Sequence, residues 1–428
     1  MERIAIIDGI RTPFSKMGTD LNDVSAQELG RIAASELIER TGVDPKDIDE
    51  VIFGCVGQPA EAANIARVIA LLAGVPKEVP AYTVHRNCAS GVESVVQALM
   101  KIQVGEGNVY LAGGTESMSN IPFYLAKPLQ EQLSHLARAK SLPEKLKILW
   151  DFYPTYLNTQ KSLKIGLQLG LTDSVCGLNM GQTAEVLAKE FGITRQEQDA
   201  FALVSHQRAI AARGVLKEEI VPVIPGPKYK KAVEIDNGPR ENQTMEALAK
   251  LKPVFDKYTG TVTAGNASQI TDGAAAVLVT TEKYAKEKGF KPLGSIRAYA
   301  FAGVEPNRMG IGPAHAIPKV LKKASLKLKD IQAIEINEAF AAQVLACLKA
   351  LESETFAKDF GYEGYTGKID PSILNVNGGA IALGHPVGTS GTRLILTMLK
   401  HLKRNNLNLG LVSLCVGGGQ GAAVVVER

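Results

Sequence analysis

This chain of 428 residues lacks cysteines at the spacing of a metal site or in the even number of a disulfide framework. The cysteines number five, an odd set in which no two have the C-x-x-C spacing of a zinc site. The sequence therefore predicts neither a metal site nor a disulfide framework, and a reducing compartment fits it best. The five are Cys55, Cys88, Cys176, Cys347 and Cys415.

Long apolar runs and a strong charge of either sign are missing too. No run of about 18 apolar residues occurs, which argues against a membrane-spanning helix. The net charge of +4 suits an anionic small ligand but is too weak and too spread out for a nucleic-acid interface. The first residues, MERIAIIDGIRTPF, begin a strand pattern at once and leave no room for a signal peptide. We therefore expect a cytoplasmic protein with no nucleic-acid partner.

What the chain does contain is a regular alternation of strand and helix patterns. Strand-like runs such as RIAIIDGIRTPF and IDEVIFGCVGQ are each followed by an amphipathic helix pattern, the first of which starts at Ser25 and stops at Gly42. Strands that alternate with helices predict a mainly parallel sheet with helices on its faces, so the fold class is α/β.

The plan of the first half recurs in the second. The segment CASGVESVVQALMKI matches GTSGTRLILTMLKHL in its S-G pair and its apolar spacing, and a glycine-rich strand end follows each. Two copies indicate a duplicated α/β unit rather than a solenoid. The predicted N-terminal half is residues 1–118 and 251–292, and the C-terminal half is residues 293–428. Residues 119–250 fit neither copy and are predicted to form an inserted loop domain between the halves.

Cys88 lies at the first turn of a predicted helix, and this position raises the question of its role. The free N–H groups of a helix start favour the thiolate, which is the nucleophilic form of cysteine. The alternative is a small buried apolar residue, which is how free cysteines commonly serve.

Three more residues follow predicted strands, where ligands of parallel α/β sheets gather. His385 lies among glycines, Cys415 ends a strand, and Asn337 lies between a strand and a helix. A cysteine nucleophile needs a base, for which His385 is the candidate, and Cys415 could be a second acid or base. The N–H groups of Cys88 and Gly417 could form an oxyanion hole. Each residue alone could be structural; together they predict one catalytic site.

Several motifs are similar to those of one family. They are NCASGVESV, GTVTAGNASQITDGAAAV, NEAFAAQ, NVNGGAIALGHPVGTSGTR and LCVGGGQGAAVVVE. Over essentially its whole length the chain resembles the thiolase family. The resemblance implies a five-layered αβαβα sandwich of two halves. It also implies an acyltransferase that uses coenzyme A and acyl-CoA as substrates, with no metal and no permanently bound cofactor.

The resemblance also assigns roles to the candidate residues. Cys88 would take the acyl group, His385 would accept its proton, and Cys415 would move the proton at the α-carbon of acetyl-CoA. A water on Asn337, together with His385, would hold the enolate oxygen, while the N–H groups of Cys88 and Gly417 would hold the acyl oxygen. Five further residues would bind the substrate or coenzyme A: Met180, Ala264, Ser268, Ala339 and Phe340.

The subclass depends on smaller signals. The sequence NMGQTAE has Asn179 where thiolases that make acetoacetyl-CoA often have histidine, while RNCAS, SHQRA, IRAYAF and the long insert resemble β-subunits of fatty-acid oxidation complexes. Many of those β-subunits carry a histidine where this chain has Asn337. We expect degradative cleavage of 3-ketoacyl-CoA, with synthesis of acetoacetyl-CoA as the alternative. A ketoacyl synthase or a non-catalytic lipid-transfer protein is more distant, because Cys88, His385 and Cys415 are all present.

Partners are suggested by the resemblance and by the insert. A homodimer or homotetramer is expected, and a hydratase/dehydrogenase subunit is a candidate partner. Residues 119–165 mix apolar and basic residues around Trp150, which suits either a solvated helix pair or a peripheral membrane contact. Lys228, Lys230 and Lys231 could meet the phosphates of coenzyme A.

Overall fold

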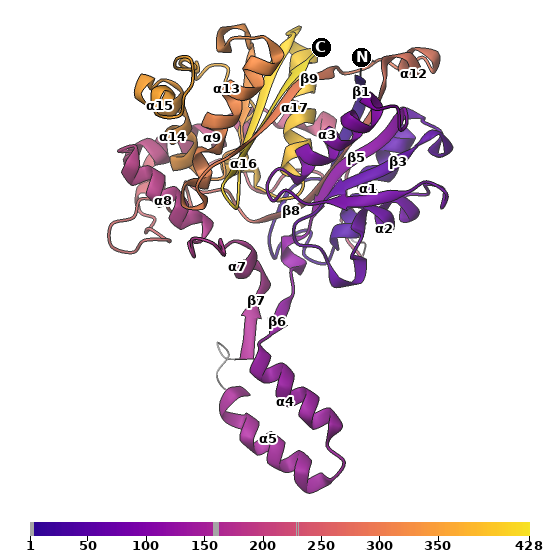
Figure 1. The fold of residues 1–428 in the computed structure, drawn as a ribbon, viewed down its shortest axis with the longest axis vertical. Coiled ribbons are helices and arrows are strands. Elements are labelled where there is room, and N and C mark those ends of the chain that lie inside the picture. Colours follow the sequence, from indigo (N-terminus) through magenta and orange to yellow (C-terminus); the bar gives the residue numbers. More distant parts are fainter. Residues whose placement is uncertain (1–3, 157–161, 228, 230) are drawn as a thin grey trace. The chain divides into compact units, whose positions relative to one another are not determined.

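The structure, a computed structural model, describes residues 4–156, 162–227, 229 and 231–428 (Figure 1). Lys228 and Lys230 lie outside the described residues. The chain divides into a main unit, Met1–Asn120 with Asp173–Arg428, and an insert unit, Ile121–Thr172.

The first sheet of the main unit comes from the N-terminal half. Its strands follow the order β1 (Ile4–Arg11), β8 (Thr271–Thr281), β5 (Val109–Glu116), β3 (Glu50–Gly54) and β4 (Ala81–Val84), and the short β2 (Ser15–Lys16) also pairs with β8. The strand β3 is parallel to both β4 and β5, whereas β8 is antiparallel to β5 and β1.

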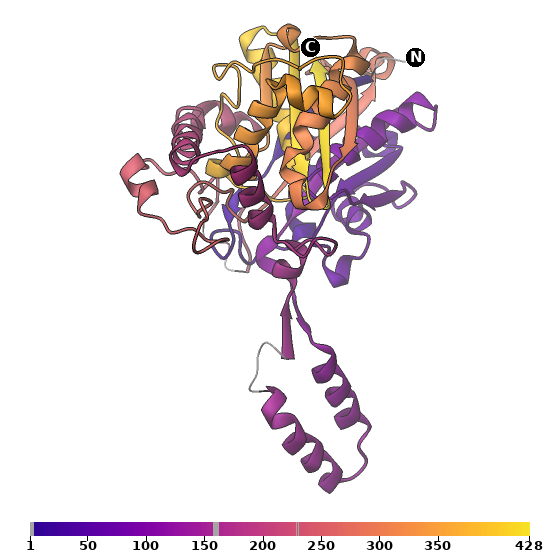
Figure 2. The same ribbon diagram turned by 60° about the vertical axis from the view of Figure 1, so that its left-hand side comes forward.

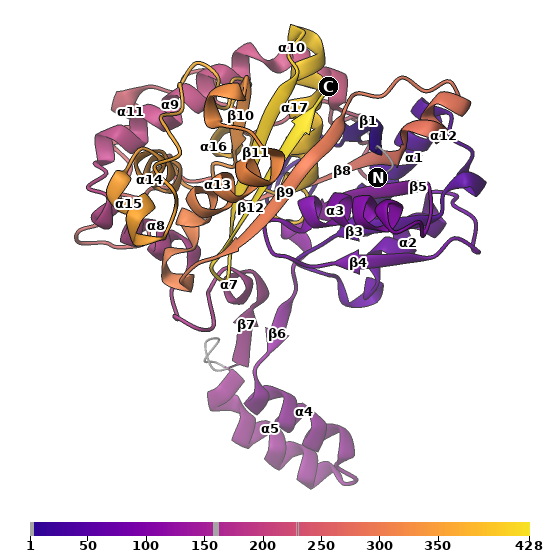
Figure 3. The same cartoon turned by 45° about the horizontal axis from the view of Figure 1, so that its top comes forward.

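The second sheet repeats this order and confirms the duplication. Its strands are β9 (Ser295–Gly303), β12 (Gln420–Glu427), β11 (Leu409–Val416) and β10 (Ala333–Ile336), with β10 and β11 parallel and the other pairs antiparallel. A single parallel bridge between Ile334 and Leu374 stands where the first sheet has β4. The two sheets form separate groups of strands in Figure 3.

Helices fill the layers around and between the sheets. The outer face of the first sheet is covered by α1 (Ala26–Thr41) and α2 (Ile65–Leu72), and that of the second by α13 (Gly312–Ala324) with α14 (Ala341–Leu351) beside it. Between the sheets lie α3 (Ser90–Gln103) and α17 (Ser390–Asn405), whose apolar residues share one core with both sheets. The fold is therefore the five-layered αβαβα sandwich that was expected.

Local sequence explains these elements. The Ser25 hydroxyl caps α1 by accepting from the N–H of Glu28, and Gly42 ends the helix at φ 67°, as the sequence predicts. Strand residues alternate between cores: Val51 and Phe53 of β3 face the outer helices, while Ile52 faces the central ones.

The connection between the last two strands of each half differs in length. In the C-terminal half, residues 417–419 join β11 directly to β12 in an antiparallel hairpin. In the N-terminal half, residues 117–270 lie between β5 and β8. Of these, residues 173–250 pack within the main unit. The boundaries of the loop domain at 119 and 250, and those of the halves, stay a prediction.

The remaining elements are short or belong to these insertions. In the main unit they are α8 (Met180–Glu190), α9 (Arg195–Ala211), α10 (Arg213–Leu216), α11 (Met245–Ala249), α12 (Glu282–Glu287), α15 (Glu354–Asp359) and α16 (Ala380–Leu383). The 3-10 turns are Pro45–Asp47, Ala60–Ala62, Met118–Asn120, Lys217–Glu219, Pro306–Ile311 and Leu328–Asp330.

The insert unit is a strand pair and a helix pair. Its strands β6 (Phe123–Leu125) and β7 (Leu163–Ile165) are antiparallel, and α7 (Gly166–Gly170) follows β7. The helices α4 (Lys127–Arg138) and α5 (Leu142–Tyr156) lie side by side, joined by a short turn (Figure 2). No helix among the described residues is both long and apolar enough to cross a membrane.

Candidate active site

Cys88 lies in a tight turn directly before α3. The turn closes through a hydrogen bond from the N–H of Ala89 to the carbonyl of Arg86 (2.9 Å), and Asn87 adopts a left-handed φ of 42°. The Ser90 hydroxyl braces it by accepting from the N–H of Arg86 (2.9 Å) and donating to the carbonyl of Asn87 (2.7 Å). No side chain caps α3, and the N–H of Ser90, its first residue, donates to the carbonyl of Asn87 (3.0 Å).

Two opposing effects act on the Cys88 sulfur. Burial raises the pKa of the thiol, while the backbone N–H groups of Gly417 and of Cys88 itself lower it. The buried carboxylate of Glu116 raises it further. Because burial prevails, the free protein holds a thiol here, contrary to our expectation that the helix start favours the thiolate. Nucleophilic attack therefore requires a base.

Asn87 joins the Cys88 turn to the β11–β12 turn. Its Nδ2 donates to the carbonyl of Gly417 at 2.7 Å. Gly417 also lies next to Met180, whose Sδ would be 3.4 Å from a Cβ added to the glycine. The N–H groups of Cys88 and Gly417, the predicted pair of oxyanion donors, both lower the pKa of the Cys88 thiol.

The hydrogen bonds of His385 determine its tautomer. Its Nδ1 lies 2.6 Å from Oγ of Ser390, and that hydroxyl donates its one hydrogen to the carbonyl of Pro386 at 3.0 Å. Nδ1 must then carry the proton, which leaves Nε2 as the free base. Burial, helped by the charge of Arg393, lowers the pKa of His385 to about 4, so the ring is neutral near pH 7.

Asn337 contacts His385 on the opposite side of the ring. Its Nδ2 lies 3.4 Å from Nε2 of His385, and its backbone N–H donates to the carbonyl of Ser413 (2.9 Å). The Oδ1 atom is buried and has no hydrogen-bond partner within the described part of the chain. A buried carbonyl oxygen without a partner is suited to hold a water or a ligand group.

Cys415 supplies the second thiol. It lies at the end of β11 and is fully buried. Burial raises the pKa of this thiol well above its usual range, and the neighbouring Cys88 and Cys347 raise it further. Cys347 is itself buried and donates to the carbonyl of Gly310 (3.2 Å). All five cysteines are free thiols in the structure.

Of the residues predicted to bind substrate, four lie in adjoining segments. The N–H of Ser268 donates to the carbonyl of Ala339 (2.8 Å), and Ala267 forms a bridge with Phe340. The Phe340 ring meets Phe255 edge to face at 6.1 Å. Phe255 in turn covers Gly181, the residue after Met180, since a Cβ there would be 2.3 Å from its ring. Ala264, the fifth predicted residue, is exposed.

Sequence reasoning missed Phe255 and Ser390. The signal for Ser390 was present, because the S-G pair aligned the two halves, but its contact with the imidazole was not foreseen. Phe255 is an isolated aromatic residue in KPVFDKYTG, a segment without periodicity.

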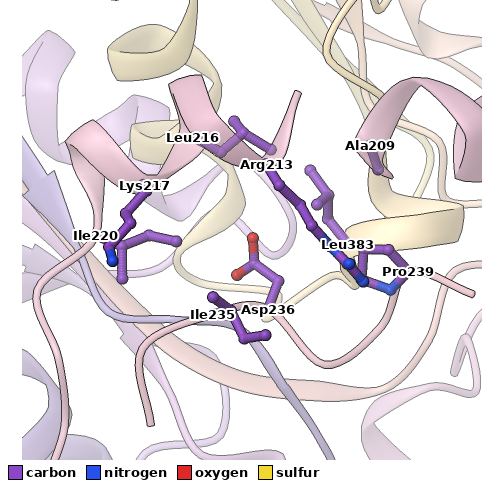
Figure 4. A pocket seen from close by; sticks show the side chains of 9 residues that line it. All are labelled: Ala209, Arg213, Leu216, Lys217, Ile220, Ile235, Asp236, Pro239 and Leu383. Carbon is purple, nitrogen blue, oxygen red and sulfur yellow. The ribbon is translucent and has the colours of Figure 1, made fainter. Parts of the chain in front are cut away.

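A small pocket lies beside the segment that leads to His385 (Figure 4). Leu383, the last residue of α16, lines it together with Ala209 and Asp236. Asp236 is fully engaged, because it accepts two hydrogen bonds from Arg11 (2.7 and 2.8 Å) and one from the N–H of Phe14 (2.7 Å). The pocket is therefore a packing defect behind the site rather than a second ligand site. Within the described ranges, no cluster of side chains has the composition of a metal site.

The fold and the site together define an α/β protein of two duplicated halves with two thiols, an imidazole and an amide at their junction. The family model described as "Thiolase, N-terminal domain" matches residues 4–283, and the one described as "Thiolase, C-terminal domain" matches residues 290–428. The chain belongs to the thiolase family, a family of acyltransferases.

Individual relatives match along their full length. A protein of Pectobacterium carotovorum named 3-ketoacyl-CoA thiolase is 42% identical, with 100% of this chain and 97% of the relative covered. The human mitochondrial 3-ketoacyl-CoA thiolase in complex with CoA has a TM-score of 0.84 at 38% identity, with 100% and 98% covered. The Bacillus anthracis acetyl-CoA acetyltransferase has a TM-score of 0.86 at 39% identity, with 100% and 99% covered.

Proposed function

We propose that the protein cleaves 3-ketoacyl-CoA with coenzyme A, giving a shortened acyl-CoA and acetyl-CoA. The main support is a pair of neighbouring thiols, Cys88 and Cys415, with the backbone N–H groups of Cys88 and Gly417 beside the first of them. The names of the full-length relatives and the complex of one of them with CoA support the same substrates. Coenzyme A takes part as a substrate and leaves as part of the shortened acyl-CoA.

The first half of the proposed reaction breaks the carbon–carbon bond. Nε2 of His385 takes the proton of the Cys88 thiol, and the sulfur attacks the 3-keto carbon while the N–H groups of Cys88 and Gly417 hold its oxygen. The bond between carbons 2 and 3 breaks, leaving an acyl thioester on Cys88 and the enolate of acetyl-CoA. Protonated His385, with a water on Oδ1 of Asn337, stabilises the enolate oxygen. The thiol of Cys415 then gives its proton to carbon 2.

The second half transfers the acyl group. The Cys415 thiolate takes the proton of the coenzyme A thiol, whose sulfur attacks the acyl–Cys88 thioester. Cys88 leaves and recovers its proton from His385, so every group returns to its starting form. A neutral His385 with a free Nε2 suits the first proton transfer, and the high pKa of Cys415 suits a proton donor to carbon.

The substrate is proposed to lie along Met180, Ala264, Ser268, Ala339 and Phe340, with Phe255 added from the structure. We propose medium or long acyl chains as the preferred substrates. Asn179 stands in place of the histidine of acetoacetyl-forming enzymes. Its side chain caps α8, because it accepts from the N–H of Gln182 (3.0 Å) while the side chain of Gln182 accepts from the N–H of Asn179 (2.9 Å). Synthesis of acetoacetyl-CoA is the second candidate, favoured by the likeness to the acetyl-CoA acetyltransferase fold.

The insert unit is proposed to contact an anionic membrane surface. Leu142, Leu146, Leu149, Trp150 and Tyr153 form an exposed apolar stripe at helical spacing on α5, and Trp150 is 81% exposed. Residues 121–172 contain seven Lys and Arg but three Asp and Glu, so basic charge accompanies the stripe. We also propose that the protein forms a homodimer or homotetramer and is cytoplasmic. A hydratase/dehydrogenase subunit is the proposed partner.

The decisive experiment traps the acyl-enzyme. Incubation with radiolabelled acyl-CoA should leave one label per chain, mapped by peptide mass spectrometry to Cys88, and Cys88→Ala should carry none. A label on Cys415 would reverse the two roles. Thiolysis rates on 3-ketoacyl-CoA of increasing chain length decide between the candidates, because activity confined to acetoacetyl-CoA would contradict the longer-chain preference.

A further inference from the structure

The two central helices meet in a reciprocal contact. A Cβ on Gly91 of α3 would lie 2.7 Å from the backbone nitrogen of Thr392, and a Cβ on Gly391 of α17 would lie 2.4 Å from that of Val92. When the S-G pairs of the two copies are aligned, Gly91 corresponds to Gly391 and Val92 to Thr392. A local two-fold axis therefore passes through this contact. It relates Cys88 to Gly388, since each lies three residues before the glycine of its helix.

Strand register extends the correspondence to the other side of the site. Gly54 of β3 pairs with Gly114 of β5, and Ile336 of β10 pairs with Ser413 of β11. Cys415 lies two residues beyond Ser413, and Glu116 lies two residues beyond Gly114. The pair Glu116–Gly388 is thus the counterpart, across the two-fold axis, of the catalytic pair Cys415–Cys88.

A carboxylate fills this counterpart site. Oε2 of Glu116 accepts the N–H groups of Gly388 (2.8 Å) and Val56 (3.1 Å), and Oε1 accepts that of Gly57 (2.7 Å) and the Cys55 thiol (3.8 Å). The side chain is 1% exposed. Burial raises the pKa of Glu116, and the three N–H donors lower it. A Cβ on Gly388 would lie 2.9 Å from Oε2, so the site has no room for a second nucleophile.

The hydrogen bond to Gly388 joins this carboxylate to the segment that carries the base. Gly388 lies between His385 and Ser390, which bond each other through Nδ1 and Oγ (2.6 Å). Two further bonds hold the same segment: the N–H of His385 donates to the carbonyl of Gln269 (3.0 Å), and the Thr389 hydroxyl donates to that of Gly273 (2.7 Å). Gln269 lies at the end of the insertion and Gly273 lies in β8, so among the described residues the bond from Gly388 to Glu116 is the hydrogen bond that ties the segment to β5, where Gly388 also packs against Gly114.

We propose that Glu116, in the filled counterpart of the catalytic site, is a positioning residue that holds the His385–Ser390 segment through the N–H of Gly388. It touches no reacting atom and acts through the placement of the imidazole. The inference rests on the proposed function, in which His385 accepts the proton of Cys88.

Glu116→Gln tests the tether without changing the volume of the side chain. A carboxamide has one acceptor oxygen, whereas the carboxylate has two. The variant therefore cannot accept both the N–H groups of Gly388 and Val56 and that of Gly57. A displaced base is expected to lower kcat by about 10²-fold, with KM changed by less than about twofold. The matched control is Cys55→Ala, which removes the weak thiol donor and leaves the carboxylate with its three N–H bonds. Its kcat should equal that of the wild type.

Single-turnover acylation by labelled acyl-CoA separates positioning from a merely structural role. The amplitude counts the competent sites, and the rate reports on each site. If Glu116 positions the base, Glu116→Gln should reach the full amplitude of labelling at a slow rate. If its role is merely structural, the amplitude should be reduced and the rate of labelling should equal that of the wild type. The second result overturns the inference. Absence of labelling in the wild type would instead overturn the proposed function.

Two further variants keep the test decisive if Glu116→Gln folds poorly. Gly388→Ala crowds the same contact from the other side and should also label fully but slowly. Ser390→Ala removes the other support of the imidazole, and its combination with Glu116→Gln should be less than additive, because both act on one ring. Wild-type rates in Gly388→Ala, or strict additivity in the double variant, would show that Glu116 does not act through His385.

Discussion

Oγ of Ser390 lies 2.6 Å from Nδ1 of His385 and donates its own hydrogen to the carbonyl of Pro386. This arrangement leaves one protonation pattern for the neutral ring, with the lone pair on Nε2. A serine at the first turn of α17 therefore determines which nitrogen of the imidazole is the base.

Ser390→Ala should slow acylation of Cys88 without unfolding the protein. Without the hydroxyl, either ring nitrogen can carry the proton and the ring loses one of its supports, so kcat is expected to fall by about 10- to 100-fold. Single-turnover labelling with acyl-CoA measures the step. Ser94→Ala is the control, since Ser94 is an equally buried serine on α3 that donates to the carbonyl of Gly91 (3.0 Å). Equal rates in the two variants would contradict the role of Ser390.

Acid should destabilise the protein through His206. Burial, with the charges of Arg240 and Lys16, lowers the pKa of His206 to about 4, and its Nδ1 accepts the N–H of Arg240 (3.2 Å). The unfolded chain, with an ordinary histidine pKa of about 6.5, binds more protons between pH 4 and 6.5. The stability that neutral His206 provides is thus complete above pH 6.5 and is lost as the pH falls toward 4.

His206→Asn tests this linkage, because the amide oxygen can replace Nδ1 as the acceptor. Unfolding by urea at pH 7 and pH 5 should show a pH-dependent loss smaller than the wild-type loss by on the order of 1–2 kcal/mol. His135→Asn is the control, since His135 is exposed in the insert unit. The same pH dependence in His206→Asn and wild type would mean that this histidine does not titrate with unfolding.

The exposed stripe of α5 should bind vesicles. Insertion of Trp150 and Leu146 between headgroups, aided by the basic residues of the insert, predicts binding that needs anionic lipid and weakens with salt. Co-sedimentation with phosphatidylglycerol vesicles measures it, and Trp150→Ser should reduce the bound fraction several-fold. Tyr258→Ser, at a 97% exposed position of the main unit, is the control. No binding, or equal binding by both variants, would leave the insert as a solvated helix pair or a protein contact.

Much of the fold could be predicted from the sequence because the signals are local and repeated. The S-G pairs and the glycine-rich strand ends identified the duplication, and the helix start placed Cys88. The contacts of Glu116 could not be predicted, because the bond to Gly388 joins residues far apart in the chain and depends on the axis between α3 and α17. The state of the Cys88 thiol was misjudged for a related reason. The pattern showed the helix start, but the burial that outweighs it depends on residues far away in the chain, such as Gly417, whose carbonyl bonds Asn87 beside the sulfur.

The last prediction separates Cys415 from Cys88. If Cys415 moves the proton at the α-carbon, Cys415→Ala should block thiolysis and condensation yet still allow acylation of Cys88, because acylation needs only the nucleophile, His385 and the N–H groups. Exchange of the acetyl methyl hydrogens of acetyl-CoA in deuterated water reports on the α-carbon step alone. Loss of one proton-transfer group should slow it by roughly 10²–10⁴-fold.

Cys347→Ala is the matched control for this experiment. Cys347 is another buried thiol, close enough to Cys415 to affect its pKa, but it is bonded to the carbonyl of Gly310 and has no part in the proposed reaction. Exchange should persist in Cys347→Ala and collapse in Cys415→Ala, while both variants are acylated on Cys88. Exchange at the wild-type rate in Cys415→Ala would assign the α-carbon proton to another base, and the two-thiol mechanism would not describe this protein.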